Sequence, residues 1–331
     1  MPIFNGAELV QKGIDSILNQ TYGNFELIIV NDGSTDNTIE VLNSYKDSRL
    51  RVISQENRGI SNAINAGHCF AKGSLIAHHD HDDISLPQRF EKQINFLSKN
   101  SEIGLVGTAA EVWNVSGPTG RFLDHPTTPG EVAFELIFNN CLVHSSWMYR
   151  QELIKEVGSY STDTHRQPPE DYEFISRLIR KFRATNLSER LVIYREIPNS
   201  TSSASRSGEN IPFSKRLALI SAENISYAAE VNLSSNQAIN FGAITHNYIE
   251  GINSKPNLKD IKKLVITAGE KLALRYHEPN ILNLVDSKLD HLSHQYYAYS
   301  GVASNLEILM QQSNLFLARL RFKIQGLILK P

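Results

Sequence analysis

The sequence predicts an α/β fold in which a mostly parallel sheet is flanked by helices and followed by a helical C-terminal region. Over roughly the first 200 residues, short apolar runs alternate with segments whose apolar side chains recur every three or four positions. Acidic residues directly follow two of these runs, at the strand ends where parallel sheets bind ligands. From residue 213 the pattern is mainly helical. We therefore expect two domains, residues 1–212 and 213–331.

The first half of the chain alternates in the order that βαβ units require. An amphipathic helix is expected from residue 8 to 20, and the apolar run 25–30 has the length of a buried strand. The polar loop after this run leads into a second helix, which Ser34, Thr35 or Asp36 can cap. The alternation continues with a strand at 50–53, a helix at 60–71, a strand at 74–78 and a helix at 86–98.

Beyond residue 129 the alternation weakens. Helices are expected near 131–138, after Arg150 and at 170–182, and a strand at 191–195. The Ser- and Thr-rich segment 199–208 is expected to be a loop.

The composition excludes several classes of protein. The chain has 331 residues and a net charge of −2, so no global field favours nucleic acid as a partner. Cys69 and Cys141 form no CxxC pair, which fits a reducing compartment better than a disulfide framework. Since no run of 18 apolar residues occurs, we expect a cytoplasmic protein that is soluble or peripheral at the inner face of the cell membrane.

The acidic cluster Asp80-His81-Asp82-Asp83 lies at the end of a predicted strand. Clustered carboxylates repel one another and lose hydration, and a divalent cation removes this penalty. Because Mg²⁺ and Mn²⁺ favour a few oxygen ligands together with substrate phosphates, an Asp-x-Asp pair suits a nucleotide diphosphate. The alternative is a solvated acidic turn that caps the next helix.

His78 and His79 directly precede this cluster, and His81 lies within it. These histidines raise the possibility of a second kind of metal site. Imidazoles and carboxylates together can build a zinc or iron site. Strand alternation, however, directs His78 and His79 to opposite faces of the sheet. We therefore expect surface or partly packed histidines.

Two further carboxylates, Asp171 and Asp32, lie at the start of a predicted helix and at the end of a predicted strand. Asp171, in Pro169-Glu170-Asp171-Tyr172, opens a predicted helix, whose positive end favours an ionised carboxylate able to accept a proton. An ordinary carboxylate at a helix start is the alternative. Asp32 follows a strand in a small-residue turn of the kind that reaches nucleotides, although GxGxxG and a Walker lysine are absent.

Taken in order, these motifs resemble glycosyltransferase family 2, a family of inverting enzymes with the GT-A fold, which is Rossmann-like. The resemblance runs from Pro2 to about Tyr194. Its segments are residues 2–5, 16–22, 25–38, 57–59 with Asn65 and Gly67, 71–73, 80–83, 87–90, 144–150, 158–160 and 170–172.

The resemblance implies a role for each matching residue. Asp171 is the implied catalytic base, with Glu170 shaping the acceptor pocket and His144 on the acceptor side. Asp82 is the implied ligand of Mn²⁺ or Mg²⁺ on the diphosphate. The implied donor-binding residues are Pro2, Phe4, Asn5, Asp32, Asn57, Asp80 and Asp82.

The implied reaction is the transfer of a sugar from a nucleotide diphosphate-sugar to a hydroxyl of a glycan or lipid-linked acceptor. A metal-held diphosphate leaves without a proton donor, so one base suffices and the anomeric carbon inverts. A glycosidase would need two carboxylates. The absence of a Gln-x-x-Arg-Trp segment favours single additions.

The chain also departs from the family pattern. A histidine of a Tyr-Arg-x-His pattern is replaced by Ile197, and an arginine that often precedes the Asn65 position is replaced by Ile64. Relatives place an apolar strand before the segment at residues 2–5, so the first strand is expected to be missing or truncated.

Two other functions compete with sugar transfer, and the C-terminal residues 314–331 have two possible roles. A sugar nucleotidyltransferase would need an early Gly-rich phosphate loop, which is missing. A non-catalytic nucleotide-sugar-binding scaffold derived from the family is the other alternative. Residues 314–331 form either a basic amphipathic helix for an anionic membrane surface or a final helix packed on its own domain.

Overall fold

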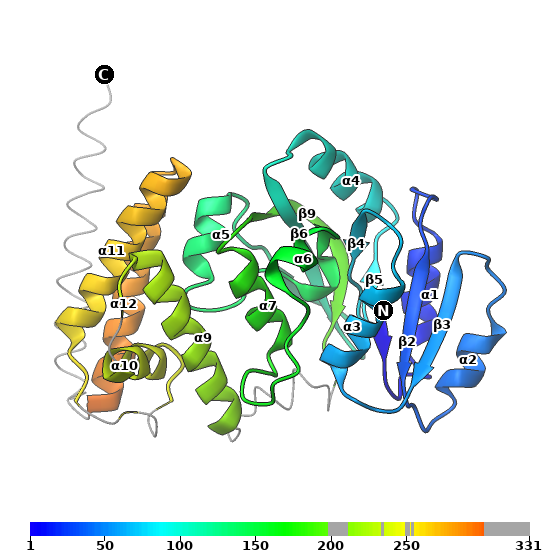
Figure 1. Cartoon of the computed structure of the whole chain (residues 1–331), viewed down its shortest axis with the longest axis horizontal. Helices are drawn as coiled ribbons and strands as arrows, with labels where there is room; N and C mark the ends of the chain where they lie inside the picture. Colours follow the sequence, from blue (N-terminus) through cyan, green and yellow to red (C-terminus); the bar gives the residue numbers. More distant parts are fainter. Residues whose placement is uncertain (198–210, 233–234, 249–251, 253–254, 301–331) are drawn as a thin grey trace.

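The computed structural model describes residues 1–197, 211–232, 235–248, 252 and 255–300. Strands occupy the N-terminal part, and the helices of the C-terminal region gather at the opposite end (Figure 1). The α/β fold with a helical C-terminal region is thus confirmed. The C-terminal helices are α9 (Ile211–Ala229), α10 (Ser235–Thr245), α11 (Leu258–Tyr276) and α12 (Ile281–Ser300). The domain boundary at residue 212 stays a prediction.

The first sheet is parallel and has the strand order β1-β2-β3, with β1 at Pro2–Ile3, β2 at Leu27–Asp32 and β3 at Leu50–Gln55. The helices between and after these strands are α1 (Val10–Leu18), α2 (Thr38–Ser44) and α3 (Ile60–Phe70). All of β2 is buried, as its apolar run predicts. The first strand of the structure is the two-residue β1, which pairs Pro2 with Val30 and Ile3 with Asn31, and the expectation of a missing or truncated strand stays a prediction.

The second sheet is mixed, with the order β4-β8-β6-β9-β5 and β7 beside β6. Of its strand pairs, β6 and β9 run parallel, whereas the others run antiparallel. The expected mostly parallel sheet is thus present as two sheets, a parallel one of three strands and a mixed one of six strands. The strands are β4 (Leu75–Ala77), β5 (Ile84–Ser85), β6 (Ile103–Asn114), β7 (Gly117–Leu123), β8 (Met148–Arg150) and β9 (Arg183–Arg195).

The predicted helices of the first domain are confirmed, with ends that differ by a few residues. Amphipathic spacing explains α1, which buries one apolar stripe with Val10, Ile14 and Ile17. The remaining helices are α4 (Arg89–Lys99), α5 (Pro129–Glu135), the 3-10 helix His144–Ser146, α6 (Leu153–Val157) and α7 (Glu170–Leu178).

Two hydrophobic cores meet at α5. One surrounds Trp147, Tyr149 and Phe174 beneath the second sheet, and the other fills the C-terminal helices. Phe134 of α5 belongs to the second core. The carboxylate of Glu278, between α11 and α12, accepts hydrogen bonds from the first backbone N–H groups of α5. The helical region is thereby anchored to the sheet domain.

Polar contacts join α9 to α7. Asn224 Nδ2 of α9 donates to Leu136 O at 2.7 Å and to Ser176 Oγ of α7 at 2.8 Å. Glu223 forms ion pairs with Arg166 and Arg180, on either side of α7. Because Asn224 is buried, these bonds fix α7 against the helical region.

None of the helices in the described part of the chain combines the length and apolarity that crossing a membrane requires. The proposed basic amphipathic helix at 314–331 lies outside the described residues.

Candidate active site

The carboxyl end of β4 and the chain that follows it carry the central acidic residues. After Ala77 the backbone turns, and Asp83 N donates to Asp80 O at 3.3 Å. Helix α1 packs closely on this turn, since a Cβ on Gly13 would lie 2.6 Å from His81 O. The His81 ring covers Gly6, where a Cβ would lie 2.4 Å from it. Gly6 and Gly13 therefore allow the chain to pack closely against His81.

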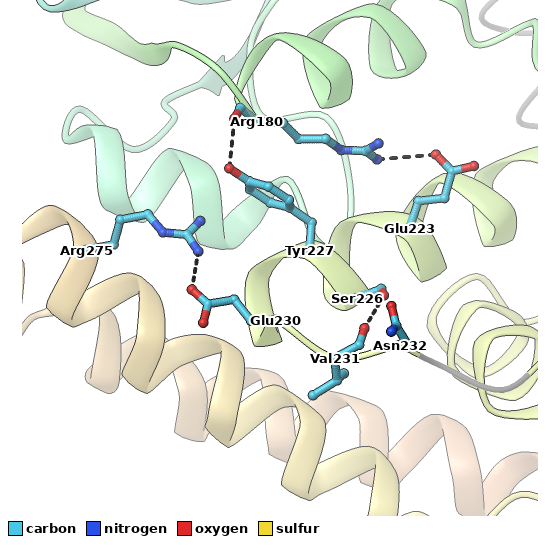
Figure 2. Close-up of a pocket in the computed structure, with 8 residues that line it drawn as sticks. All are labelled: Arg180, Glu223, Ser226, Tyr227, Glu230, Val231, Asn232 and Arg275. Carbon is cyan, nitrogen blue, oxygen red and sulfur yellow. Dashed lines mark hydrogen bonds and ion pairs between the residues drawn. The ribbon is translucent and has the colours of Figure 1, made fainter.

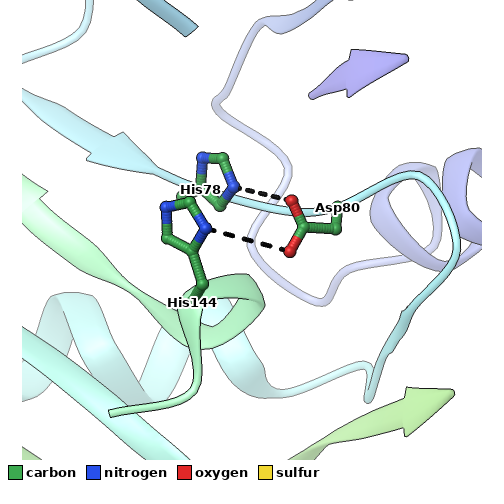
Figure 3. Close-up of side chains that lie close together, drawn as sticks. All are labelled: His78, Asp80 and His144. Carbon is green, nitrogen blue, oxygen red and sulfur yellow. Dashed lines mark hydrogen bonds and ion pairs between the residues drawn. The ribbon is translucent and has the colours of Figure 1, made fainter. Parts of the chain in front are cut away.

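Asp80 lies at the centre of a hydrogen-bonded group (Figure 3). Its Oδ1 accepts from His78 Nε2 at 2.9 Å, and its Oδ2 accepts from Ser145 Oγ at 2.9 Å. Burial alone would raise the pKa of Asp80, yet the neighbouring imidazoles and the Ser145 hydroxyl hold that pKa well below its usual range. Asp80 is therefore an anion at neutral pH.

His144 joins the group from the 3-10 helix, 64 positions further along the chain than Asp80. Its ring stacks on His78 with centroids 3.7 Å apart, and its Nδ1 lies 4.0 Å from Asp80 Oδ2. The other ring nitrogen, Nε2, lies 2.9 Å from the hydroxyl of Tyr160. The sequence assigned His144 to the acceptor side but did not predict that it meets Asp80.

The expectation of surface or partly packed histidines is wrong for His78 and His79, which are 4% and 2% exposed. They are buried because β8 and the 3-10 helix pack over the end of β4, where His78 N donates to Trp147 O. Burial, followed by the adjacent His144, lowers the pKa of His78 to about 3. His78 is therefore a neutral imidazole. His79 does not join this group; its Nδ1 lies 3.5 Å from Ser145 O.

Arg195, the last residue of β9, forms hydrogen bonds with Asp82 and Asp83. Arg195 donates from Nε to Asp82 O, from its backbone N to Asp83 Oδ1 at 2.8 Å, and from Nη2 to Leu9 O at 3.2 Å. Burial raises the pKa of Asp82, and burial with the charge of Asp82 raises that of Asp83 well above its usual range. Asp83 is 1% exposed and Asp82 is half-buried, so the two carboxyl groups repel one another in a partly desolvated environment.

Arg89 is a structural residue of the site that sequence reasoning missed. Its side chain is fully buried, and its guanidinium donates to His78 O at 3.2 Å and to Ser145 O. Burial lowers its pKa to about 9, whereas Asp83 and Asp80 raise it. The guanidinium therefore ties the end of β4 to the 3-10 helix. The only available signal was its place in the Pro87–Phe90 family segment.

Glu170 and Asp171 form the first turn of α7. Asp171 Oδ2 accepts from Asn140 Nδ2 at 2.7 Å, and Oδ1 accepts from the backbone N of Tyr172 at 2.6 Å. Burial, then the charge of Asp171, raises the pKa of Glu170 to about 8. Asp80 adds a smaller contribution to this shift.

Asp32 is 3% exposed, and its carboxylate is engaged by the chain itself. Oδ1 accepts from Gln55 Nε2 at 2.6 Å and from Arg58 N at 3.0 Å, and Oδ2 accepts from Gly59 N at 2.8 Å. The structure thus brings Asp32 to the loop before α3, where it fixes backbone. Its contact with a nucleotide stays a prediction.

The other predicted donor residues lie at the ends of β1 and β3. Phe4 is 45% exposed, whereas Pro2 is buried in β1. Asn5 Oδ1 accepts from Thr35 N at 2.8 Å and so joins the loops after β1 and β2. Asn57 is exposed and lies against Gly33, whose φ of +76° and lack of Cβ allow this approach.

A separate surface pocket of about 390 Å³ lies between α7, α9 and α11 (Figure 2). Its charged side chains pair with each other, Arg180 with Glu223 at 3.2 Å and Arg275 with Glu230 at 2.7 Å. It contains none of the predicted site residues. The arrangement around Asp80 is therefore the better candidate for the active site.

Comparison with known proteins identifies the family. The family model described as "Glycosyl transferase family 2" matches residues 1–158. An uncharacterized glycosyltransferase of Haemophilus influenzae is 33% identical over 219 residues, 62% of this chain and 67% of the relative. The O-antigen biosynthesis glycosyltransferase WbnJ of Escherichia coli is 33% identical over 211 residues, 62% of this chain and 81% of the relative. The chain belongs to glycosyltransferase family 2.

Solved structures support the GT-A fold of this family 2 glycosyltransferase. The structure of S. aureus TarS 1-349 in complex with UDP-GlcNAc aligns with a TM-score of 0.55 and 16% identity, over 91% of this chain and 90% of that one. At this identity the likeness concerns the fold. The residues matched by the family model include Asp32, Asp80 and Asp82, whereas Asp171 lies beyond them. The roles of all four in this family 2 glycosyltransferase stay predictions.

Proposed function

We propose that the protein transfers a sugar, with inversion, from a nucleotide diphosphate-sugar to a hydroxyl of a glycan or lipid-linked acceptor. The observation that carries the proposal is the meeting of two acidic motifs, one after β4 and one at the start of α7. Tyr160 supports a common site for the two motifs, because its hydroxyl lies 2.9 Å from His144 Nε2 and its ring stacks on Phe174 of α7 with centroids 4.3 Å apart. Asp171 is the base in this proposal, because a helix N-terminus favours the carboxylate that accepts the proton.

The two carboxyl groups of α7 have different roles in the proposal. Glu170, with its pKa raised to about 8, keeps its proton at neutral pH. It therefore shapes the acceptor pocket as a neutral group. Asp171 is oriented by Asn140 Nδ2, which leaves its remaining lone pairs for the acceptor hydroxyl. One base is sufficient for inversion, since the nucleoside diphosphate leaves without a proton.

Mn²⁺ or Mg²⁺ is the proposed cofactor, and the residues fit it. Asp82 is half-buried and Asp83 is buried, both carboxyl groups have raised pKa values, and a cation would offset their repulsion. Asp82 is the proposed ligand, with Arg195 holding its backbone. When bound, the cation supplies charge stabilisation to the leaving diphosphate.

The relatives support the choice of donor and biological setting. One structural neighbour is a complex with UDP-GlcNAc, and one relative is named for O-antigen biosynthesis. We therefore propose single additions in the assembly of a cell-surface polysaccharide or glycolipid, at the cytoplasmic side of the membrane. A non-catalytic nucleotide-sugar-binding scaffold is the alternative.

The test compares Asp171→Asn with wild type in a screen of nucleotide-sugars with Mn²⁺ or Mg²⁺. Thermal shift first identifies the donor, since a ligand that binds only the native state raises Tm. Turnover of this donor by wild type separates the enzyme from the scaffold. Asp171→Asn should bind the donor with unchanged affinity and lose transfer. Asp260→Asn, an exposed acid in the first turn of α11, is the matched control. Transfer by a folded Asp171→Asn protein would move the base elsewhere.

A further inference from the structure

Three side chains from separate parts of the chain direct ligand atoms to one point. His78 and Asp80 follow β4, and His144 begins the 3-10 helix between α5 and β8. One nitrogen of each imidazole and a carboxylate oxygen all lie within 4.8 Å of one another. Figure 3 shows both rings facing the same carboxylate. We propose that His78, Asp80 and His144 bind one first-row transition-metal ion, such as Zn²⁺, without a nucleotide.

The distances are close to those of an assembled site. His78 Nε2 lies 2.9 Å from Oδ1 of Asp80, and His144 Nδ1 lies 4.0 Å from Oδ2. Ligands at about 2.0–2.1 Å from a tetrahedral zinc are roughly 3.3 Å apart. An entering ion therefore separates the first pair slightly and draws the second together. In the metal-free chain His78 Nε2 donates to Asp80 Oδ1, so binding of the ion at Nε2 requires that this nitrogen give up its proton, to Nδ1 or to solvent.

The surrounding residues orient the ligands as outer-shell partners do in metal sites. His144 Nε2 lies 2.9 Å from the Tyr160 hydroxyl, and a proton on Nε2 leaves the Nδ1 lone pair facing Asp80. Ser145 Oγ donates to Asp80 Oδ2, and Asp80 N donates to the same hydroxyl. Tyr160 is 2% exposed, so its hydroxyl is a fixed partner.

The ligand set selects the class of metal. Two imidazole nitrogens and one carboxylate suit Zn²⁺, Co²⁺ and related ions, whereas Mg²⁺ favours oxygen ligands. Water or substrate completes the coordination, as in open zinc sites. The site is distinct from the proposed donor-associated cation, because Asp82 is not among its ligands. It also does not depend on the proposed sugar transfer.

Calorimetric titration of the chelator-treated full chain with Zn²⁺ alone tests the proposal. One Zn²⁺ per chain is expected, and Mg²⁺ alone should not bind. His144→Ala should abolish binding, and Tyr160→Phe should weaken it about 10- to 100-fold. His165→Ala, at an exposed histidine, and Asp82→Asn should bind Zn²⁺ as wild type does. No binding by wild type, or full binding by folded His144→Ala, would overturn the proposal.

Co²⁺ provides a readout on the wild-type chain that does not depend on how variants fold. Co²⁺ in a four-coordinate nitrogen and oxygen site gives intense visible absorption bands, and hydrated or six-coordinate Co²⁺ gives weak ones. Intense bands that Zn²⁺ displaces are expected. Weak bands would refute the assigned ligands. Asp171→Asn should leave these spectra unchanged, so the failure of the proposed transfer and the failure of this site are distinguishable.

Discussion

Replacing Glu278 should weaken the attachment of the helical region to the sheet domain. Its carboxylate accepts from Gly130 N at 3.0 Å and from Glu131 N at 3.2 Å, across nearly 150 residues of chain. Thr128 Oγ1 also bonds to it. A negative charge at the start of α5 further interacts with the positive end of the helix.

The expected magnitude follows from these contacts. Hydrogen bonds to a charged acceptor contribute about 1.5–3 kcal/mol, and a helix N-terminal cap about 0.5–2 kcal/mol. Glu278 is half-buried, so water replaces part of what is lost. Thr128 Oγ1 also still accepts from Glu131 N. We expect Glu278→Ala to lower the free energy of unfolding by about 2 kcal/mol, and Glu278→Gln by about 1 kcal/mol.

Equilibrium urea unfolding followed by circular dichroism measures this loss. Glu270→Ala is the matched control, because Glu270 is exposed on α11 and surface substitutions change stability by at most about 0.5 kcal/mol. If Glu278→Ala costs no more than Glu270→Ala, the anchoring role of this carboxylate is wrong.

The remaining predictions concern the site. Burial raises the pKa of Glu170 from 4.5 to about 8, so the folded state holds the proton more tightly; its contribution is complete below about pH 4.5 and is lost as pH rises through 8. Between pH 5 and 8 the free energy of unfolding of wild type, measured with urea, should fall by an amount on the order of a few kcal/mol. The Glu170→Gln variant should not show this fall. Tyr172→Phe removes the bond to Leu136 O and should cost about 1–2 kcal/mol in the same assay, whereas an unchanged midpoint would contradict this. Asp82→Ala should abolish the effect of Mn²⁺ on donor affinity, and equal calorimetric affinity with and without the ion in wild type would argue against the metal role.

Much of the fold was predictable because its signals are local. Amphipathic spacing identified α1, α3 and α4, and the buried run before Asp32 identified β2. The acidic residues at element ends were predictable for the same reason, since each follows a strand or opens a helix. Asp80 and Asp171 could therefore be located on the fold without any knowledge of long-range contacts.

The second sheet and the histidine cluster could not be predicted this way. No strand was predicted at β6 or β7, and in β6 the glycines Gly104 and Gly107, which strands disfavour, interrupt the apolar run. Its parallel pairing with β9 joins segments about 80 residues apart. The meeting of His78 with His144 depends on β8 packing beside β4, for which the sequence has no local signal.

The polar contacts between α7 and α9 bear on how relatives of this chain can exchange parts. The family model ends at residue 158, which would suggest a natural point for recombination. A chimera joined there would take α7 and α9 from the same parent and keep Asn224 and Glu223 matched to α7, whereas a junction between the two helices would separate these partners. Helices α7 and α9 should therefore be exchanged between relatives as one unit.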